Sequence, residues 1–294
     1  MPARPAARSL SRTPARSRTR RRRRGSRALR ITRYLPSMRD LRRTWRTFRK
    51  APLLMQFVVG AVGIITLWLA VNWIYQVIRK PSELFFPVSG TLYKTPGETW
   101  EAYEPIFRRH STQVMTPELL AALAQVEGSG NPIVRTYWRW TWRMQPFEVY
   151  RPASSAVGMY QITDGTFAEA RRLCIHDHVV VDDGPWDDWS SCWFNWAYMR
   201  VIPSHAVELT AAYLDRKIEE ILRRNGVKSA PLHKKQDLAA LIHLCGAGAG
   251  NLYVRRGFRL LPDQRCGDHE ARVYVARVNS FKRVFAALAA RKEE

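Results

Sequence analysis

The chain has 294 residues, and its 48 lysines and arginines against 25 aspartates and glutamates give a net charge of +23. Residues 1–50 hold 19 of the basic residues and a single acid, Asp40, so that the rest of the chain carries only +5. Apolar residues make up 46% of the sequence, and eleven residues are tryptophan. This composition can bury a core, which excludes a wholly disordered chain and one that only coats nucleic acid.

Residues 1–50 are predicted to form a disordered basic arm, because the run Arg20 to Arg24 lies among Ser, Pro, Ala and Thr. Such an arm can bind anionic lipid, at about 1 kcal/mol per basic residue near the surface, or the phosphates of nucleic acid. The apolar segment that follows favours lipid. No aromatic residues interleave with the arginines in the manner of a base-reading surface, so nucleic acid is the less favoured partner.

Residues 51–78 are an uninterrupted run of 28 uncharged residues. About 20 helical residues, each rising roughly 1.5 Å, cross the hydrocarbon core of a bilayer, so this run predicts a single transmembrane helix. A buried helix of a soluble protein seldom contains more than about 14 wholly apolar residues. A cleaved signal peptide also fits less well, because no small-x-small site follows Ala70, and Trp73 and Tyr75 instead resemble an interfacial aromatic belt.

The flanking charges predict the orientation of this helix. The 19 basic residues precede it, and only Arg79, Lys80 and Lys94 are basic within about twenty residues after it. The N-terminus is therefore expected in the cytoplasm. Everything after about residue 80 is expected beyond the membrane, which in a bacterium is the periplasm or the wall side.

The four cysteines are too few for a disulfide scaffold and too widely spaced for a zinc ribbon. The number and spacing of the cysteines therefore predict no metal site. Beyond the membrane disulfides are chemically permitted. Of the three possible connectivities, our hypothesis is the one with two short loops, Cys174 with Cys192 and Cys245 with Cys266.

Residues 79–97 are punctuated by Pro and Gly and are predicted to be a linker, whereas residues 98–294 show apolar spacing at helical intervals. Thr116 and Pro117 form an N-cap with proline in the first turn. The helix that they start is expected to end near Glu127, because Gly128, Gly130 and Asn131-Pro132 cannot continue it. A second, amphipathic helix is expected from Pro203 to Asn225.

Glu127 thus closes a largely apolar helix at the terminus where the helix dipole disfavours negative charge. Burial and the dipole both favour a protonated carboxyl, which suits a general acid. A lone Glu before a glycine is also common at solvated helix ends, so that spacing alone leaves both interpretations open.

The string AALAQVEGSGNP, followed by SSAVGMYQITDGTF, resembles the opening of the lytic transglycosylase (SLT, goose-lysozyme-like) domain. In that family a helix ends in a catalytic Glu, an Asn-Pro follows, and a Gly-Ala-x-Gly-Leu-Met-Gln segment comes next. The matching positions are Glu127, Asn131, Pro132, Ala156, Gly158 and Gln161. GAGAG at 246–250 resembles the family's Asn-Ala-Gly-Pro-Gly turn, and EARVYV at 270–275 its closing Glu-Thr-x-x-Tyr-Val, so the resemblance covers roughly residues 98–290.

The resemblance implies a mainly α, lysozyme-like domain over residues 98–294, and cleavage of the MurNAc-GlcNAc linkage of peptidoglycan with formation of 1,6-anhydro-muramyl ends. Glu127 would be the general acid and then the base. Gln161, Tyr274 and the backbone near Gly158 would position N-acetyl groups and orient Glu127, and Ser154 or Ser155 would contribute a hydroxyl. No cofactor is implied. The partners would be peptidoglycan glycan strands and, through residues 51–78, the bacterial inner membrane; local opening of the wall for an envelope-spanning assembly is a further hypothesis.

The chain departs from the family pattern at several of these positions. Ser155 replaces the usual glycine and Tyr160 the usual methionine, and Cys245-Gly246 stands where the family commonly has Tyr-Asn, a pair that helps line the sugar cleft. Tyr160 and Gly246, by their matching positions, complete the predicted substrate-binding set.

Two segments leave alternatives open. Residues 133–153 are an insertion relative to the family's usual loop and interleave Trp and Tyr with Arg, so that they can stack on sugar faces, rest at the membrane interface or pack as an ordinary β-hairpin. Residues 176–189 are rich in Asp and His, and we expect a solvated acidic loop there rather than a calcium site. In an inverting hydrolase this loop would supply the second carboxylate, about 6.5 to 9.5 Å from Glu127.

Two other functions compete with the transglycosylase. One is a non-catalytic peptidoglycan-binding or scaffold protein with a lysozyme-like fold, in which the altered Cys245-Gly246 turn has disabled turnover. The other is a hydrolytic muramidase. A Ser-His-Asp peptidase is excluded, because His205 and His243 are present without a Gly-x-Ser-x-Gly nucleophile elbow.

Overall fold

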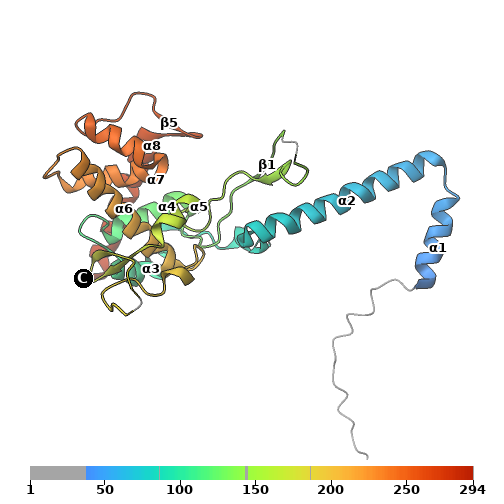
Figure 1. The fold of residues 1–294 in the computed structure, drawn as a ribbon, viewed down its shortest axis with the longest axis horizontal. Helices are drawn as coiled ribbons and strands as arrows, with labels where there is room; N and C mark the ends of the chain where they lie inside the picture. Colours follow the sequence, from blue (N-terminus) through green and yellow to red (C-terminus); the bar gives the residue numbers. More distant parts are fainter. Residues whose placement is uncertain (1–37, 86, 143–144, 186, 294) are drawn as a thin grey trace, which may run out of the picture. The chain divides into compact units, whose positions relative to one another are not determined.

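The computed structural model describes residues 38–85, 87–142, 145–185 and 187–293, and they are mainly helical, as predicted (Figure 1). The chain divides into two compact units, Met1–Ile64 and Ile65–Glu294. Eight α-helices occur in the described part: α1 Met38–Arg49, α2 Leu53–Arg79, α3 Pro96–Arg109, α4 Pro117–Gly128, α5 Asp164–Ala170, α6 Pro203–Arg224, α7 Leu232–Arg255 and α8 Ala271–Glu293.

The strands form three short antiparallel pairs. They are β1 Trp138–Trp140 with β2 Tyr150–Pro152, β3 Leu173–His176 with β4 Val179–Asp182, and β5 Arg265–Cys266 with β6 His269–Glu270. Within the described residues, the connections contain the 3-10 helices η2 Pro81–Phe85, η3 Ser89–Thr91 and η4 Asn195–Ala197. The strand pairs are hairpins between helices and not a central sheet.

The prediction that residues 1–50 form a disordered arm is wrong for residues 38–49. Residues 1–37 lie outside the described residues, but Met38–Arg49 is the helix α1. Asp40 lies in its first turn and Arg49 in its last, where each charge suits the helix dipole. The rings of Trp45 and Phe48 are 5.8 Å apart, and the Arg49 guanidinium lies over Trp45. An apolar stripe at helical spacing therefore folds inside a segment whose net charge predicts disorder.

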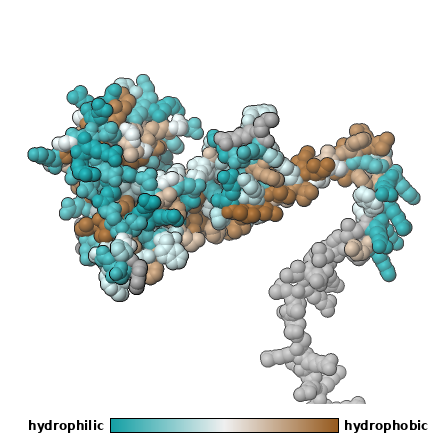
Figure 2. Space-filling model, viewed as in Figure 1, coloured by the Kyte–Doolittle hydropathy of each residue, from teal (hydrophilic) through white to brown (hydrophobic). Residues whose placement is uncertain are grey.

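Helix α2, Leu53–Arg79, closely matches the predicted membrane-crossing segment 51–78. It is the one helix in the described part of the chain that is long and apolar enough to cross a membrane. Its apolar side chains are exposed along most of its length, as the brown surface in Figure 2 shows. Such a surface needs an apolar environment to cover it.

Helix α4 lies at the centre of the second unit and packs against α3 and α8. Leu119, Leu120 and Leu123 are fully buried. The predicted N-cap is confirmed, since Thr116 accepts a hydrogen bond from the Leu119 amide and Pro117 is the first helical residue. Helices α6 and α7 pack on each other beside it. This arrangement fixes the C-terminal end of α4 inside the domain.

The segment predicted as a linker, 79–97, is packed against the domain. Glu83 is fully buried, with Lys80 3.4 Å away, and it accepts hydrogen bonds from Arg135 and Trp138. The Lys94 amide donates to the Ser129 carbonyl at 2.8 Å, at the end of α4. The last residues of the predicted linker already belong to α3. The connection between α2 and the domain is therefore a built structure and not a free tether.

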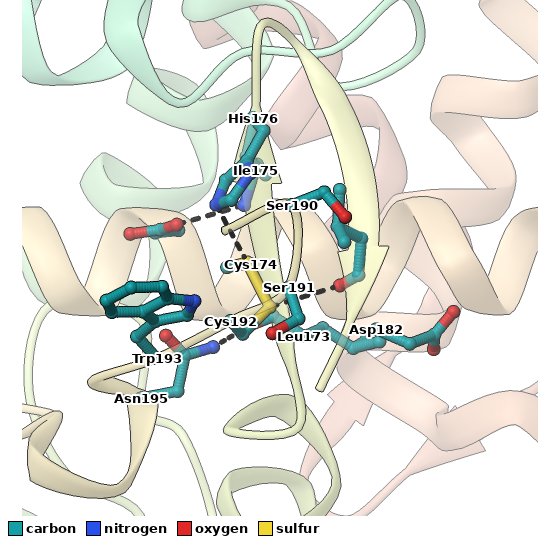
Figure 3. The surroundings of a disulfide bond; sticks show 12 residues. Leu173, Cys174, Ile175, His176, Asp182, Ser190, Ser191, Cys192, Trp193 and Asn195 are labelled. Carbon is teal, nitrogen blue, oxygen red and sulfur yellow. Dashed lines mark hydrogen bonds between the residues drawn. A yellow bond between two sulfur atoms is a disulfide. The ribbon is translucent and has the colours of Figure 1, made fainter. Parts of the chain in front are cut away.

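Both predicted disulfides are confirmed. Cys174 of β3 is bonded to Cys192, and Cys245 of α7 is bonded to Cys266 of β5. Figure 3 shows the first bond, with the Asn195 side chain donating to the Leu173 carbonyl beside it. The first bond joins the β3–β4 hairpin to the loop that leads to α6, and the second joins α7 to the hairpin that leads to α8.

Candidate functional site

Glu127 lies in the last turn of α4, directly before Gly128. A Cβ at residue 128 would come within 2.9 Å of the Met159 backbone, so the helix end passes too close to that segment for a side chain. Ser129 follows in the left-handed conformation, at φ 47°, and ends the helix. The Glu127 side chain is 17% exposed. The expected end of the helix near Glu127 is confirmed, and its side chain is mostly buried.

Two side chains from other helices contact the Glu127 carboxyl. The Tyr274 hydroxyl of α8 donates a hydrogen bond to Glu127 Oε1. His243 Nε2 of α7 is 3.5 Å from the same oxygen. Burial, and then the nearby Glu127 charge, raise the pKa of Tyr274 well above its ordinary value, so that its phenol keeps the proton it donates. The prediction that Tyr274 orients Glu127 agrees with this contact.

A cavity of about 220 Å³ lies beside this group. Glu127 does not line it directly, but His243, which contacts Glu127, does. Its lining residues are Gln161, Ile162, Thr163, Thr166, Ala170, Leu209, Thr210, Tyr213, Ile242, His243, Leu244 and Gly246. None of these residues, all in the described part of the chain, is acidic. The cavity offers hydroxyl, amide and imidazole groups, and its His243 contacts Glu127.

Gln161 lines this cavity, and Gly158 lies in the turn that precedes it. Gln161 has φ 47°, and its Nε2 donates to the Gly158 carbonyl at 2.9 Å and to the Val134 carbonyl at 3.3 Å. Gly158 has φ 79°, and a Cβ there would lie 2.3 Å from the Arg200 carbonyl oxygen. Only glycine fits this turn. The structure brings Gln161 to the cavity and gives Gly158 a structural role in the turn.

Ser154 and Ser155 do not line the cavity. The Ser154 hydroxyl accepts from the Ala156 amide at 3.1 Å, and the Ser155 hydroxyl accepts from the Asp164 amide at 3.2 Å. The Ser155 carbonyl also accepts from Arg200. Both hydroxyls therefore accept hydrogen bonds from backbone amides on either side of Gly158.

Tyr160 is not available to a substrate, which corrects its prediction as a substrate-binding residue. Its side chain is 0% exposed, and its hydroxyl donates to the Leu120 carbonyl at 3.1 Å. Burial raises the pKa of this phenol well above its ordinary value. Its large ring extends from the loop into the core against α4, where it finds the hydrogen-bond partner that a buried tyrosine needs.

Gly246 lies where α7 departs from helical geometry, at φ 80° and ψ 171°. It lines the cavity three residues after His243. The disulfide at Cys245 ties this kink to β5. Gly246 is thus at the predicted place, with its neighbour fixed by a covalent bond instead of the Tyr-Asn pair.

His243 is a site residue that the sequence did not indicate, because no motif connects it with Glu127. The hydroxyls of Thr163, Thr166 and Thr210 were missed for the same reason. The helical spacing of His243 and Gly246, one turn apart, was the available signal, since it places them on one face of α7.

The two segments that the sequence left open lie outside this cavity. Residues 133–153 include the β1–β2 hairpin, which packs against α2. In the acidic segment, Asp182 pairs with Arg216 at 2.6 Å, and Asp182 and Asp183 line a different cavity, of about 820 Å³. No group of three or more His, Cys, Asp or Glu within the described ranges is placed to hold a metal ion.

The sequence matches no protein-family model. No curated protein is significantly similar to it. The resemblance to lytic transglycosylases therefore depends on the short motifs and on the contacts that the fold adds to them.

Proposed function

We propose that the protein is a membrane-anchored lytic transglycosylase of lysozyme-like fold that cleaves peptidoglycan. The observation that carries this proposal is the pair of contacts on one oxygen of Glu127, a hydrogen bond from Tyr274 and the nearby imidazole of His243. A carboxyl that is shielded and oriented at the end of an apolar helix, next to a polar cavity, suits a general acid.

The chemistry needs one carboxyl. Cleavage of a glycosidic bond requires a proton on the departing oxygen and stabilisation of an oxocarbenium-like centre. Glu127 donates that proton, the substrate's own 2-acetamido group stabilises the cation, and the muramyl 6-hydroxyl attacks. Glu127 then accepts the proton of that hydroxyl, and the product is a 1,6-anhydro sugar.

The position of the acidic segment favours this mechanism over an inverting hydrolase. An inverting enzyme needs a second carboxylate at about 6.5 to 9.5 Å to activate water. No acidic residue within the described ranges lines the cavity beside Glu127. Asp182 and Asp183, in the loop expected to supply one, face another cavity together with Arg216 and Lys217.

The proposed location is the bacterial inner membrane, with α2 as the single crossing. The basic excess of residues 1–50 keeps the N-terminus in the cytoplasm, and residues 81–294 then lie in the periplasm. The two disulfides support this side of the membrane, since they persist in oxidising compartments. Glycan strands are thereby within reach of Glu127.

The decisive experiment is digestion of purified sacculi by the full-length chain in detergent, with Glu127→Gln compared to wild type. We expect release of anhydro-muropeptides to fall by about 10²- to 10⁴-fold, the usual contribution of a general acid. Glu118→Gln, on the first turn of the same helix, is the matched control and is expected to retain activity.

The products separate the alternatives. Equal digestion by Glu127→Gln and wild type would contradict the role of Glu127. Reducing ends in place of anhydro ends would identify a muramidase. Binding of sacculi without soluble products from the wild type would identify the scaffold protein.

A further inference from the structure

The outer end of α2 is attached to the insertion that carries the β1–β2 hairpin. Asn72 Nδ2 donates to the Tyr150 carbonyl at 2.8 Å, and Gln76 Nε2 donates to the Phe147 carbonyl at 2.6 Å. Arg79 pairs with Glu148 at 3.0 Å. These three polar residues of α2 are one turn apart, so they form a stripe on one face of the helix. Asn72 is only 1% exposed, although it lies within an apolar helix.

Aromatic rings extend this contact along the helix. The rings of Tyr75 and Phe147 are 5.3 Å apart, and those of Trp68 and Trp140 are stacked at 6.3 Å. Trp68 lies one turn before Asn72. The hairpin therefore contacts α2 from Arg79 back to Trp68, which lies in the apolar part of the helix.

The length of α2 places this contact relative to a bilayer. Its 27 residues extend about 40 Å at roughly 1.5 Å each, whereas a hydrocarbon core is about 30 Å thick. If Leu53 begins the crossing, the last turns, from about Asn72 to Arg79, project into the outer headgroup layer. Trp68 lies about 6 Å closer to the bilayer centre than Asn72. Trp140, stacked on Trp68, reaches the same depth.

The hairpin has the side chains of a membrane interface. Trp142 is fully exposed, and Trp140 and Tyr137 are each 65% exposed although they are aromatic. Trp and Tyr concentrate at the boundary between headgroups and acyl chains, because their rings are apolar and their N–H or O–H groups are polar. This exposed aromatic surface is continuous with the lipid-facing surface of α2, so that the same lipid can cover both.

We propose that the β1–β2 hairpin is immersed in the outer headgroup layer of the membrane that α2 crosses, with Trp140 and Trp142 at the acyl boundary. This inference rests on the proposed membrane placement of α2. The side-chain N–H groups of Asn72 and Gln76 are then satisfied within the protein, because the hairpin backbone accepts their hydrogen bonds. The domain thus has a second membrane contact that sets its orientation to the bilayer.

The test places an environment-sensitive fluorophore on a cysteine at residue 142 in the full-length, oxidised chain (Trp142→Cys). The protein is reconstituted in vesicles of phosphatidylethanolamine and phosphatidylglycerol that carry a nitroxide on the headgroup or on the acyl chain. Trp196→Cys, another exposed tryptophan far along the chain, is the matched control, and Leu67→Cys reports insertion of α2 itself.

We expect headgroup nitroxide to quench residue 142 at least about threefold more than residue 196, and aqueous iodide to show the opposite order. Equal quenching at 142 and 196, with residue 67 quenched by acyl nitroxide, overturns the hairpin proposal and leaves the placement of α2 intact. If aqueous iodide and not acyl nitroxide quenches the fluorophore at residue 67, both the hairpin proposal and the membrane placement of α2 are overturned. Trp142→Cys should still digest sacculi in detergent, so that a failure of the proposed catalysis is measured separately.

Discussion

The carboxyl of Glu127 is held by side chains that are remote from it in the sequence. Tyr274 lies 147 residues further along the chain and donates directly to Oε1. This bond strengthens as Glu127 gives up its proton in the proposed reaction, because a hydrogen bond to an ionised acceptor is about twice as strong as one between neutral groups. The carboxyl therefore has a fixed direction before any ligand arrives, which is the condition for efficient proton transfer.

Tyr274→Phe tests this positioning. A hydrogen bond to a charged group contributes about 1.5 to 3 kcal/mol, so we expect kcat for release of anhydro-muropeptides to fall about 10- to 100-fold while KM is nearly unchanged. Tyr253→Phe, a buried tyrosine of α7 that packs on Phe258, is the control and should keep wild-type kcat. A Tyr274→Phe enzyme with wild-type kcat would show that this phenol does not position the acid.

His110 makes stability depend on pH. Burial lowers its pKa from the ordinary value of 6.5, although Glu208, 3.5 Å from Nδ1, acts in the opposite direction. Glu208 also accepts hydrogen bonds from the Tyr198 hydroxyl and the Ile175 amide. The positive charges of Arg109 and His205 lower the pKa of His110 further. The folded protein thus holds fewer protons than the unfolded chain just below pH 6.5, so stability is present above that value and is lost as the pH falls through it.

We therefore expect the denaturant midpoint to decrease between about pH 7 and pH 5. His110→Gln should flatten this slope whatever its effect on stability at neutral pH, whereas His233→Gln, at an exposed position, should not. An unchanged slope in His110→Gln would assign the pH dependence to other groups.

At the scale of elements, the sequence predicts what local caps and breakers decide. The helix expected from Pro117 to about Glu127 is Pro117–Gly128, and the one expected from Pro203 to Asn225 is Pro203–Arg224. Both depend on prolines in the first turn and on residues at the end that cannot continue a helix. The packing of residues 79–97 could not be predicted, because it depends on partners such as Arg135 far along the chain.

The Cys245–Cys266 bond links α7, which carries His243, to the hairpin that precedes α8, which carries Tyr274. Cys245 follows His243 by two residues, and Cys266 lies in the hairpin that leads into α8 and Tyr274. We expect Cys245→Ser with Cys266→Ser to lower sacculus digestion about tenfold or more, because small displacements of catalytic groups are costly.

The second disulfide provides the control for that experiment. Cys174→Ser with Cys192→Ser removes a comparable closed loop outside the site, and each pair should cost about 2 to 4 kcal/mol of stability. Activity is compared at a temperature at which circular dichroism shows both variants folded. Equal loss of activity in the two variants would indicate a general effect of stability and not of positioning.

A comparison of Gly158→Ala with Gly226→Ala separates the energetic cost of a positive φ from the cost of a steric clash. Gly158 and Gly226 both have positive φ, at 79° and 67°, but only at Gly158 would a Cβ meet another atom, the Arg200 carbonyl oxygen at 2.3 Å. Gly226→Ala should lose roughly 1 kcal/mol of unfolding free energy from strain alone. Gly158→Ala should lose at least about 2 kcal/mol more, measured by chemical denaturation. Equal losses would mean that Arg200 moves away freely.

At the scale of the whole molecule, the helical domain and the later part of α2 form one unit, Ile65–Glu294. The built connection through Glu83 and the hydrogen bonds of Asn72 and Gln76 replace the flexible tether expected from Pro and Gly content. On the proposed function, cutting is then confined to glycan at one height above the lipid.

Asn72→Leu with Gln76→Leu tests this attachment. Each removed hydrogen bond contributes about 0.5 to 1.5 kcal/mol, so amides of residues 138–152 should exchange with deuterium about 5- to 100-fold faster. Ile74→Leu with Ile78→Leu, at exposed positions on the same helix, is the control. Unchanged exchange in the first variant would mean that other contacts hold the hairpin.

The sequence was sufficient for the helical class, the apolar helix and the position of Glu127, because each depends on composition or on neighbouring residues. It was not sufficient for His243, whose role depends on how α7 packs beside α4. Tyr160 was assigned to the substrate because it occupies a family position, whereas its bulk lets it fill the core. The sequence pattern selects Glu127 as the candidate acid, and packing decides which side chains surround it.

The pairing of α4 with α8 has a consequence for biosynthesis. Glu127 reaches its phenol partner only when α8 has been made, because Tyr274 lies 147 residues later in the chain. On the proposed function, a growing polypeptide that still lacks α8 has a Glu127 that Tyr274 does not yet orient for proton transfer. On that function, efficient wall cutting begins only after α8 has been synthesised and has packed against α4.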